Sequence, residues 1–411
     1  MRFPRTTRVR AGAVALPRRF GTSTLPLARL FAAQRAALAD VLAVFLPLLV
    51  GFYLLVLFAT WMVPEYAGSA YPRWYTGADR LIDASWRWDG QWYMSIARDG
   101  YRLTSGYTNV AFFPLYPLLI RFVGLFLGAG GLPLAGVIVA NLAFLGALFY
   151  LYRLAEGDGG RGLAQRAVWL VAVMPTAFFF HAAYSESLFL LTAAGSLYHL
   201  RRRLWWAAGL WAALGATTRA QGILLVLPLA WEMGRLWWKA RVLPARQVGA
   251  LALPFLGLGL FMGYLFLSFG DPLAFLHVQG AWGRSLGLPL FTVWNALQFA
   301  LAGYRGAAYP LELLNIAIVF LYLALSLASL RRWPASYTLY ALGSIAVALM
   351  LPSGGHTITS GARFMAVVFP PLFTLAAWSG RWPWLMTALL ALSLPLYALL
   401  VTLFVNWYWV V

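Results

Sequence analysis

The chain has 411 residues, of which 62% are hydrophobic and only 10% are charged, whereas an ordinary soluble domain has roughly 25% charged residues. Apolar runs of about 18 residues or more recur from residue 41 onward, and each is long enough to cross about 30 Å of hydrocarbon. The composition therefore excludes a soluble enzyme and predicts an all-α polytopic membrane protein.

The formal net charge is +19, because 31 basic residues outnumber 12 acidic ones. Such an excess can indicate a nucleic-acid-binding protein. Here, however, the basic residues are spread over short segments between apolar runs, as the positive-inside rule requires. We therefore expect a lipid bilayer and no nucleic acid as a partner. Cysteine is absent, which excludes a disulfide framework and a thiolate metal site.

Residues 1–40 form a basic leader with eight arginines, which we expect to be cytoplasmic. The apolar run 41–63 is too long for the hydrophobic region of a signal peptide and is typical of an uncleaved anchor. Residues 41–411 are then expected to form a single integral-membrane domain.

Clusters of arginine indicate which of the remaining apolar segments cross the membrane. If the basic residues at 153–166, 201–203, 235–246, 331–332 and Arg381 are all cytoplasmic, the apolar segments alternate without conflict. With the first span, this predicts about eleven transmembrane helices: 41–63, 132–152, 163–180, 186–200, 204–218, 222–238, 247–269, 310–330, 335–352, 364–380 and 384–405.

The apolar segment 111–128 breaks this alternation, because counting it as a crossing would place residues 201–203 outside. It also contains two prolines and a central Arg121. We therefore predict a helix that dips into the outer leaflet without crossing. Residues 64–131 then form a long first extracytoplasmic loop with interfacial helices.

The stretch "SWRWDGQWYMSIARDGY" (85–101) places acidic residues among tryptophans within that loop. A helix over 85–98 would put Asp89 on one face with Trp92 and Tyr93, where partial desolvation makes a carboxylate a stronger base. Alternatively, the tryptophans form an aromatic belt at the membrane interface, and Asp89 is a residue at the water-exposed edge of that belt. These residues alone leave both interpretations open. Asp99, just before the Gly100 turn, is expected to be a solvated or capping residue.

Three further clusters lie at predicted outer ends of spans: "HAAYSES" (181–187), "TTRAQG" (217–222) and "GGHTITSGARF" (354–364). Each also has a structural interpretation, as a helix cap or a snorkelling side chain, and for a histidine alone that interpretation is favoured. Arginine on the outer side runs against the positive-inside bias, which favours a phosphate-binding role for Arg219 and Arg363. Arg284 and Arg305 lie outside any motif and are expected to tolerate substitution.

Taken together, these motifs resemble the PIG-V-like mannosyltransferases, here as a prokaryotic member. The resemblance rests on segments that occur in family order: "WDGQWYMSIARDGY" (88–101), "AFFPLYP" (111–117), "AAYSESLF" (182–189), "TTRAQG" (217–222) and "ARF" (362–364). It implies a GT-C-type helical bundle, a lipid-phosphate sugar as donor, and an essential aspartate in the first outer loop, which Asp89 matches. The sequence departs from the eukaryotic pattern after Tyr101 and at Gln221, which leaves the acceptor open.

The hypothesis is an inverting transfer of a sugar, mannose by the resemblance, from a polyprenyl-phosphate donor to a glycan or lipid acceptor outside the cytoplasmic membrane. Asp89 would be the general base, and Arg219 and Arg363 would bind the donor phosphate. The expected substrate-binding residues are Trp88, His181, Tyr184, Glu186, Gln221 and His356. Because phosphate leaves as a stable anion, no metal or other cofactor is predicted.

Two rival hypotheses stay open. A lipid or sugar transporter would carry ionisable residues near the bilayer midplane and paired broken helices from internal repeats. The charged motifs gather instead at one predicted face, and no repeat is evident. The second rival is a catalytically inert assembly protein on the same fold, against which the presence of both Asp89 and the arginines argues.

Overall fold

The computed structural model describes residues 27–68, 73–104, 106–241, 245–303, 306, 309–352, 358 and 360–410. In this part of the chain, all regular secondary structure is helical, which confirms the all-α class. Five helical stretches are long and apolar enough to cross a membrane: α1 (Leu27–Met62), α5 (Leu132–Gly159), α10 to α11 (Ala245–Val248 through Leu253–Phe269, joined by η5, Gly249–Ala252), α14 (Tyr309–Ser329) and α18 (Pro383–Val405). These helices mark an integral membrane protein.

The other predicted spans coincide with shorter helices. They are α6 (Arg161–Ala172) with η3 (Ala177–Phe180), α7 (Glu186–Arg201), α8 (Trp205–Thr218), η4 (Ala220–Leu225) with α9 (Val226–Ala240), α15 (Ala335–Met350), and α16 (Gly361–Ala366) with α17 (Pro370–Ser379). Eleven crossings therefore stay a prediction. Two of these spans are broken at prolines: α6 stops before Pro175, and α17 starts anew at Pro370. Proline lacks the backbone N–H that a continuing helix needs.

The described residues of the predicted first outer loop form short helices: α2 (Arg80–Asp83), η1 (Ala84–Trp86), α3 (Gly90–Asp99), η2 (Asn109–Ala111) and α4 (Leu115–Leu127). Helix α4 has 13 residues, short of the roughly 20 that a crossing requires. Tyr116 and Ile120 are buried against the protein, whereas Leu125 and Phe126 on the same helix are exposed. That amphipathic arrangement is typical of an interfacial helix. The segment between α11 and α14 contains α12 (Ala274–His277), η6 (Val278–Trp282) and α13 (Pro289–Leu301).

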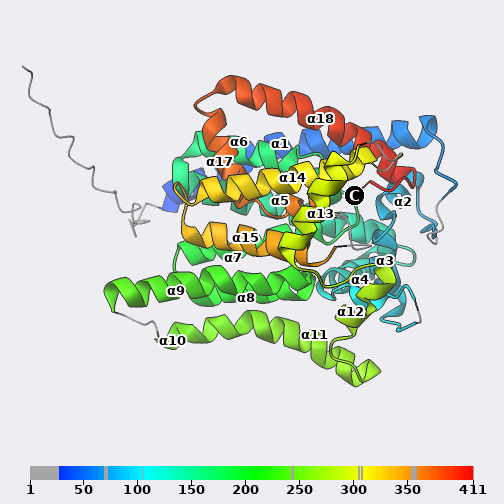
Figure 1. The fold of residues 1–411 in the computed structure, drawn as a ribbon, viewed down its shortest axis with the longest axis horizontal. Helices are drawn as coiled ribbons and strands as arrows, with labels where there is room; N and C mark the ends of the chain where they lie inside the picture. The colour runs from blue at the N-terminus through cyan, green and yellow to red at the C-terminus, as the bar shows by residue number, and fades with distance from the viewer. Residues whose placement is uncertain are drawn as a thin grey trace, which may run out of the picture.

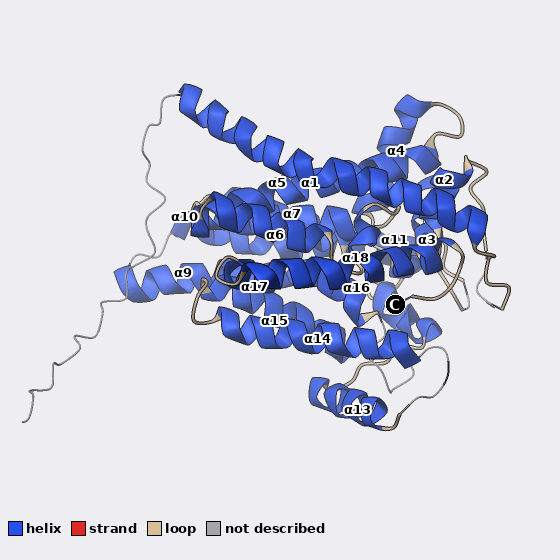
Figure 2. Cartoon of the chain, turned by 90° about the horizontal axis from the view of Figure 1, so that it is seen from above, coloured by secondary structure: helices blue, strands red, loops and turns tan. Residues whose placement is uncertain are grey.

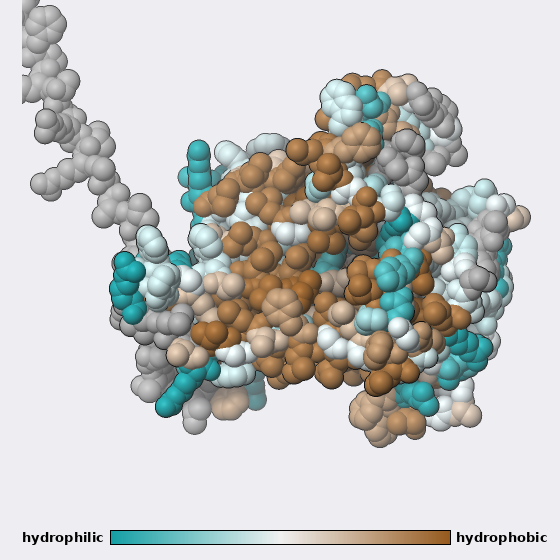
Figure 3. All heavy atoms as spheres, turned by 60° about the horizontal axis from the view of Figure 1, so that its bottom comes forward, coloured by the Kyte–Doolittle hydropathy of each residue, from teal (hydrophilic) through white to brown (hydrophobic). Residues whose placement is uncertain are grey.

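The long helices lie side by side with similar axes, and α2, α3, α4 and α12 gather at one end of the bundle (Figure 1). The view from above places α2, α3 and α4 at that same end (Figure 2). Hydrophobic side chains cover the middle of the face seen in Figure 3, and hydrophilic ones gather toward its two ends. This distribution suits a bundle whose middle faces hydrocarbon.

The segment between α1 and α5 is fixed to the bundle through Trp86. Its indole Nε1 donates a hydrogen bond of 3.1 Å to the carbonyl of Pro133, near the start of α5. Gly136, one turn later, leaves room for the ring, because a Cβ there would lie 2.2 Å from Trp86 Cζ2. The hydroxyl of Tyr116 on α4 donates to the carbonyl of Gly136 at 3.0 Å. These contacts set the position of the segment that carries Asp89.

The structure leads to a labelling prediction. Because the chain has no native cysteine, single cysteines can be introduced at exposed positions at the two ends of α5, Ala129→Cys and Gly157→Cys. A membrane-impermeant maleimide should label them from opposite sides. Leu103→Cys, before α4, should label from the same side as Ala129→Cys if α4 does not cross. Labelling of Leu103→Cys and Ala129→Cys from opposite sides would make α4 a true span.

Candidate functional site

Asp89 lies in a tight turn at the start of α3. Trp88 before it has a φ of 54°, in the left-handed region that non-glycine residues rarely adopt. Gly90 after it approaches the segment at Ala183, because a Cβ at Gly90 would lie 3.3 Å from the Ala183 carbonyl oxygen. Ala183 in turn donates its backbone N–H to the Ser85 carbonyl at 3.0 Å. The turn therefore holds Asp89 beside the "HAAYSES" segment.

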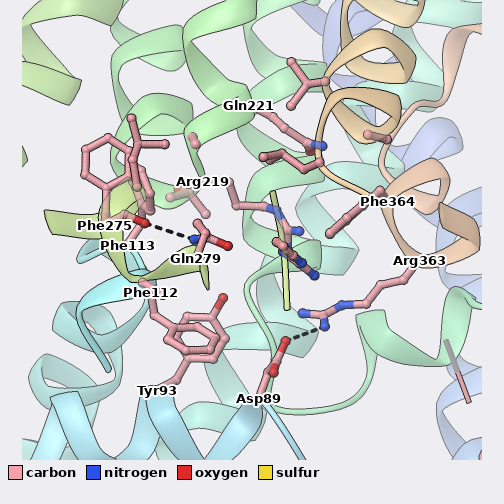
Figure 4. A pocket seen from close by; sticks show the side chains of 18 residues that line it. Asp89, Tyr93, Phe112, Phe113, Arg219, Gln221, Phe275, Gln279, Arg363 and Phe364 are labelled. Atoms are coloured by element: carbon pink, nitrogen blue, oxygen red, sulfur yellow. Dashed lines mark hydrogen bonds and ion pairs between the residues drawn. The ribbon is translucent and has the colours of Figure 1, made fainter. Parts of the chain in front are cut away.

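A chain of charges joins four separate motifs. Glu186, at the start of α7, accepts hydrogen bonds through Oε1 from Arg219 Nη1 at 2.6 Å and from Arg363 Nε. Arg363 also donates from Nη1 to Asp89 Oδ2 at 2.5 Å, as Figure 4 shows. The sequence motifs predicted each of these residues, and the structure brings them together.

The members of this chain differ in accessibility. The Glu186 side chain is fully buried and that of Arg363 is 6% exposed, whereas Asp89 keeps 19% of its side-chain surface. A buried carboxylate between two guanidinium groups is held ionised by them. Glu186 is thus placed to fix the arginines, and Asp89 is the carboxylate that a substrate can reach.

These residues border a pocket of about 140 Å³. Its lining includes Asp89, Tyr93, Arg219, Gln221, Arg284 and Arg363, and Figure 4 shows Asp89 and Tyr93 on one side with Arg219, Gln221 and Arg363 facing them. Tyr93 is fixed by a 2.7 Å hydrogen bond between its hydroxyl and that of Ser185. Aromatic rings of Phe112 and Phe364 complete the wall. The arginines of this pocket are suited to binding an anion such as phosphate.

Arg284, which lies outside any motif and was expected to tolerate substitution, lies in the candidate site. It is half-buried and lines the same pocket as Asp89, and its guanidinium carbon lies 5.3 Å from the ring centroid of Phe364. Backbone hydrogen bonds from Ser285 to Pro352 and from Gly287 to Met350 bring its loop against the end of α15. Arg305 lies outside the described residues.

The surroundings of Arg284 differ from those of the other two arginines. The pKa of the Arg284 guanidinium is lowered, first by burial and also by the positive charges of Arg363 and Arg219. The nearby Asp89 carboxylate opposes this shift. In the described part of the chain Arg284 forms no ion pair, whereas Arg219 and Arg363 both do. The pocket thus contains a guanidinium whose charge no carboxylate side chain neutralises directly.

Gln221 is the predicted substrate-binding residue that best fits the pocket. It lines the cavity, is 7% exposed, and its Oε1 has no hydrogen-bond partner among the described residues. Buried polar atoms normally have a partner, so this amide is available to a bound molecule.

Trp88 and Tyr184 lie behind the pocket and do not line it. The Trp88 indole packs edge-on against Trp407 and Trp409, with ring centroids 5.7 and 5.0 Å away. Tyr184 donates its hydroxyl to the Arg87 carbonyl at 2.8 Å, and its ring centroid lies 4.6 Å from the Arg363 guanidinium carbon. Both therefore position the Asp89 turn or Arg363, in place of the predicted direct contact with substrate.

His181 is a core residue, contrary to the substrate-binding expectation. Its side chain is fully buried, and its Nδ1 lies 2.7 Å from Asn141 Oδ1. Phe52 and Phe144 pack on its ring, with centroids 5.5 and 5.2 Å away. His181 does not line the pocket. His356 lies outside the described residues.

Comparison with known proteins gives a family match. A family model described as "Mannosyltransferase (PIG-V)" matches residues 47–269. GPI alpha-1,6-mannosyltransferase 2 of Rattus norvegicus is 32% identical over 166 residues, 36% of this chain and 32% of that protein. GPI mannosyltransferase 2 of Drosophila melanogaster is 31% identical over 122 residues, 27% of this chain and 26% of that protein. The chain therefore aligns with a third or less of the length of these relatives.

Among solved structures, the apo oligosaccharyltransferase of Archaeoglobus fulgidus is similar with 14% identity and a TM-score of 0.46. The aligned region covers 89% of this chain and 56% of that one. The same archaeal protein tethered to an acceptor peptide gives a TM-score of 0.42, with 11% identity and coverage of 89% and 55%.

The buried charge chain leads to a stability prediction. Glu186→Gln removes the carboxylate that two guanidinium groups share, which should lower the free energy of unfolding by about 3–5 kcal/mol. The control is Glu156→Gln, whose partly exposed carboxylate pairs with Arg153 one helical turn earlier and should cost less than about 1 kcal/mol. Thermal unfolding in detergent measures both. Equal shifts would mean that Glu186 has no special structural role.

Proposed function

This chain belongs to the Mannosyltransferase (PIG-V) family, and on that premise we propose that it transfers mannose from a polyprenyl-phosphate donor to a glycan or lipid acceptor. The observation that carries the proposal is the pocket that combines the accessible carboxylate of Asp89 with three guanidinium groups. A hydroxyl acceptor needs a base, and a phosphate leaving group needs cations.

Asp89 is the proposed general base. Of its two carboxylate oxygens, only Oδ2 accepts a hydrogen bond from the described residues, namely from Arg363, which leaves Oδ1 to take the proton of the acceptor hydroxyl. The acceptor oxygen forms a bond to the anomeric carbon as the bond from that carbon to the phosphate oxygen breaks. Attack opposite the leaving group inverts the configuration at that carbon. The donor departs as polyprenyl phosphate.

Arg219, Arg284 and Arg363 are the proposed phosphate ligands. Three guanidinium groups against the carboxylates of Glu186 and Asp89 leave an excess of one positive charge in the site. A donor phosphate would neutralise that excess, and guanidinium groups bind phosphate oxygens through paired donors. Because the phosphate leaves as a stable anion, the proposal includes no metal or other cofactor.

We place the reaction on the extracytoplasmic face of the cytoplasmic membrane, in a GT-C-type bundle of about eleven spans with residues 1–40 inside. The choice of face rests on the positive-inside rule, and two observations agree with a site at that end of the bundle. The pocket lies near α3 and α12, at the end of the bundle where the outer-loop helices gather (Figure 1). The exposed apolar surface of α4 at Leu125 and Phe126 would let the prenyl chain lie along that helix.

The first functional prediction concerns the base. Asp89→Asn keeps the shape of the side chain but cannot take a proton at neutral pH, so transfer should fall about 10²–10⁴-fold. The assay follows labelled mannose from polyprenyl-phosphate mannose into lipid or glycan products in membranes that contain the protein. An Asn variant with normal turnover would reduce Asp89 to a structural residue.

The matched control for that experiment is Asp99→Asn. Asp99 lies at the other end of α3 and pairs with Arg98 at 3.0 Å on the exposed side of the loop. The hydrogen bond from Arg98 lowers its pKa, so it is a poor base, and its substitution should change turnover only slightly. A loss as large as that of Asp89→Asn would indicate damage to α3 as a whole.

The second functional prediction separates phosphate binding from folding. Arg284→Ala removes a proposed phosphate ligand, so it should weaken donor use and slow transfer about 10²–10³-fold. Because the substitution breaks no ion pair in the described structure, thermal stability should stay unchanged. Arg219→Ala and Arg363→Ala should lower both activity and stability, because each leaves Glu186 with one cation. Arg102→Ala, with a side chain that is 69% exposed, is the control. Transfer rate against donor concentration distinguishes the outcomes. If Arg284→Ala behaves like Arg102→Ala, the phosphate does not reach Arg284.

A further inference from the structure

A second charged cavity lies at the opposite end of the bundle from Asp89. It has a volume of about 490 Å³ and is lined by Asp158, Arg166, Arg332, Trp333, Gly380 and Arg381. The segments that border it, including α6 and α17, lie at the end of the molecule away from α2 and α3 (Figure 1). The proposed transfer reaction uses none of these residues.

Three arginines converge on this cavity from separate parts of the chain. Arg166 comes from α6, Arg332 from the turn between α14 and α15, and Arg381 from the turn between α17 and α18. In the described part of the chain, none of the three forms an ion pair. Like charges around one cavity repel unless an anion lies between them.

The acidic residue of the lining does not supply that anion. Asp158 accepts hydrogen bonds from Arg201 Nη2 at 2.7 Å and from the Tyr337 hydroxyl at 2.6 Å. Its side chain is only 5% exposed. Each of its oxygens already accepts one hydrogen bond, and Arg201 balances its charge, so the charge of the three arginines is left for a bound molecule.

Two of the lining groups are held in place. Arg166 donates from Nε to the Ala376 carbonyl at 2.7 Å, and its guanidinium lies over Gly380, where a Cβ would meet Nη2 at 2.5 Å. The Trp333 indole donates to Thr374 Oγ1 at 3.0 Å. Nε is thus occupied and the Arg166 guanidinium is oriented, so one cation of the cavity has a fixed position, whereas Arg332 and Arg381 are exposed side chains.

The neighbourhood of the cavity points to a lipid. Trp382 and Trp384, directly after Arg381, are 49% and 67% exposed, and exposed tryptophans are typical of the boundary between headgroups and hydrocarbon. Basic pockets between membrane helices bind the headgroups of anionic lipids. We propose that this cavity binds the phosphate headgroup of an anionic phospholipid, in the leaflet opposite the transfer site.

The test measures lipid binding and needs no transferase activity. The full chain in neutral detergent is titrated with mixed micelles that contain phosphatidylglycerol, and bound lipid is counted by native mass spectrometry. Arg166→Gln, Arg332→Gln and Arg381→Gln combined should weaken this binding by roughly a hundredfold, since each basic residue at an anionic surface contributes a factor of about five. The control combines Arg203→Gln, Arg246→Gln and Arg331→Gln, which remove the same charge from exposed positions outside the cavity. Equal losses in both would overturn the proposal.

A charge-neutral pair of variants tests the geometry. Gly380→Ala should push the Arg166 guanidinium aside and weaken phosphatidylglycerol binding, whereas Gly234→Ala, with open space around it, should not. Replacing all three cavity arginines by lysine keeps the charge and should restore most of the binding, which separates a binding defect from misfolding. Micelles that contain phosphatidylcholine should change neither the amount of phosphatidylglycerol bound nor the melting temperature of the protein. If inorganic phosphate at low millimolar concentration displaces phosphatidylglycerol from the protein, the cavity is a site for soluble phosphate and the lipid assignment fails.

Discussion

The candidate site depends on one buried carboxylate. Glu186 has no exposed surface, yet it carries a charge that two arginines from distant motifs neutralise. Arg363 then extends from Glu186 to Asp89, so the position of the accessible carboxylate is set through the buried one. In a pocket of low dielectric, such fixed charges stabilise developing charge without having to reorganise. The two carboxylates thus differ in their surroundings: Glu186 pairs with the cations inside the protein, and Asp89 lines the pocket.

Much of the fold could be predicted from hydrophobicity alone. Every predicted span contains a helix, because apolar stretches of this length satisfy their backbone in lipid only as helices. It was harder to predict whether each span is one continuous helix. The stretch 163–180 has the hydropathy of one span, but Pro175 interrupts it, and α17 begins at Pro370. The sequence contained both prolines, yet hydropathy averages over a window and does not register a missing N–H.

The site was predictable where motifs marked it. Asp89, Glu186, Arg219 and Arg363 each lie in a short motif, and they meet in the structure. Arg284 was missed because its loop reaches the pocket through backbone hydrogen bonds with Met350 and Pro352, a pairing that no local pattern encodes. The argument that singled out Arg219, arginine on the outer side, applied equally to Arg284. His181 failed in the opposite way, since Phe52 and Phe144, which enclose it, come from other helices.

The Asp89 turn also has a place in the order of biosynthesis. Arg87 donates from Nε to the carbonyl of Val405, 318 positions later, and Asn406 donates to the carbonyl of Ala59 at the end of α1. A ribosome delivers α1 and the turn long before α18 exists. The hydrogen bond from Arg87 to Val405 therefore forms only after α18 has entered the membrane. A partly synthesised chain contains the Asp89 turn without this hydrogen bond.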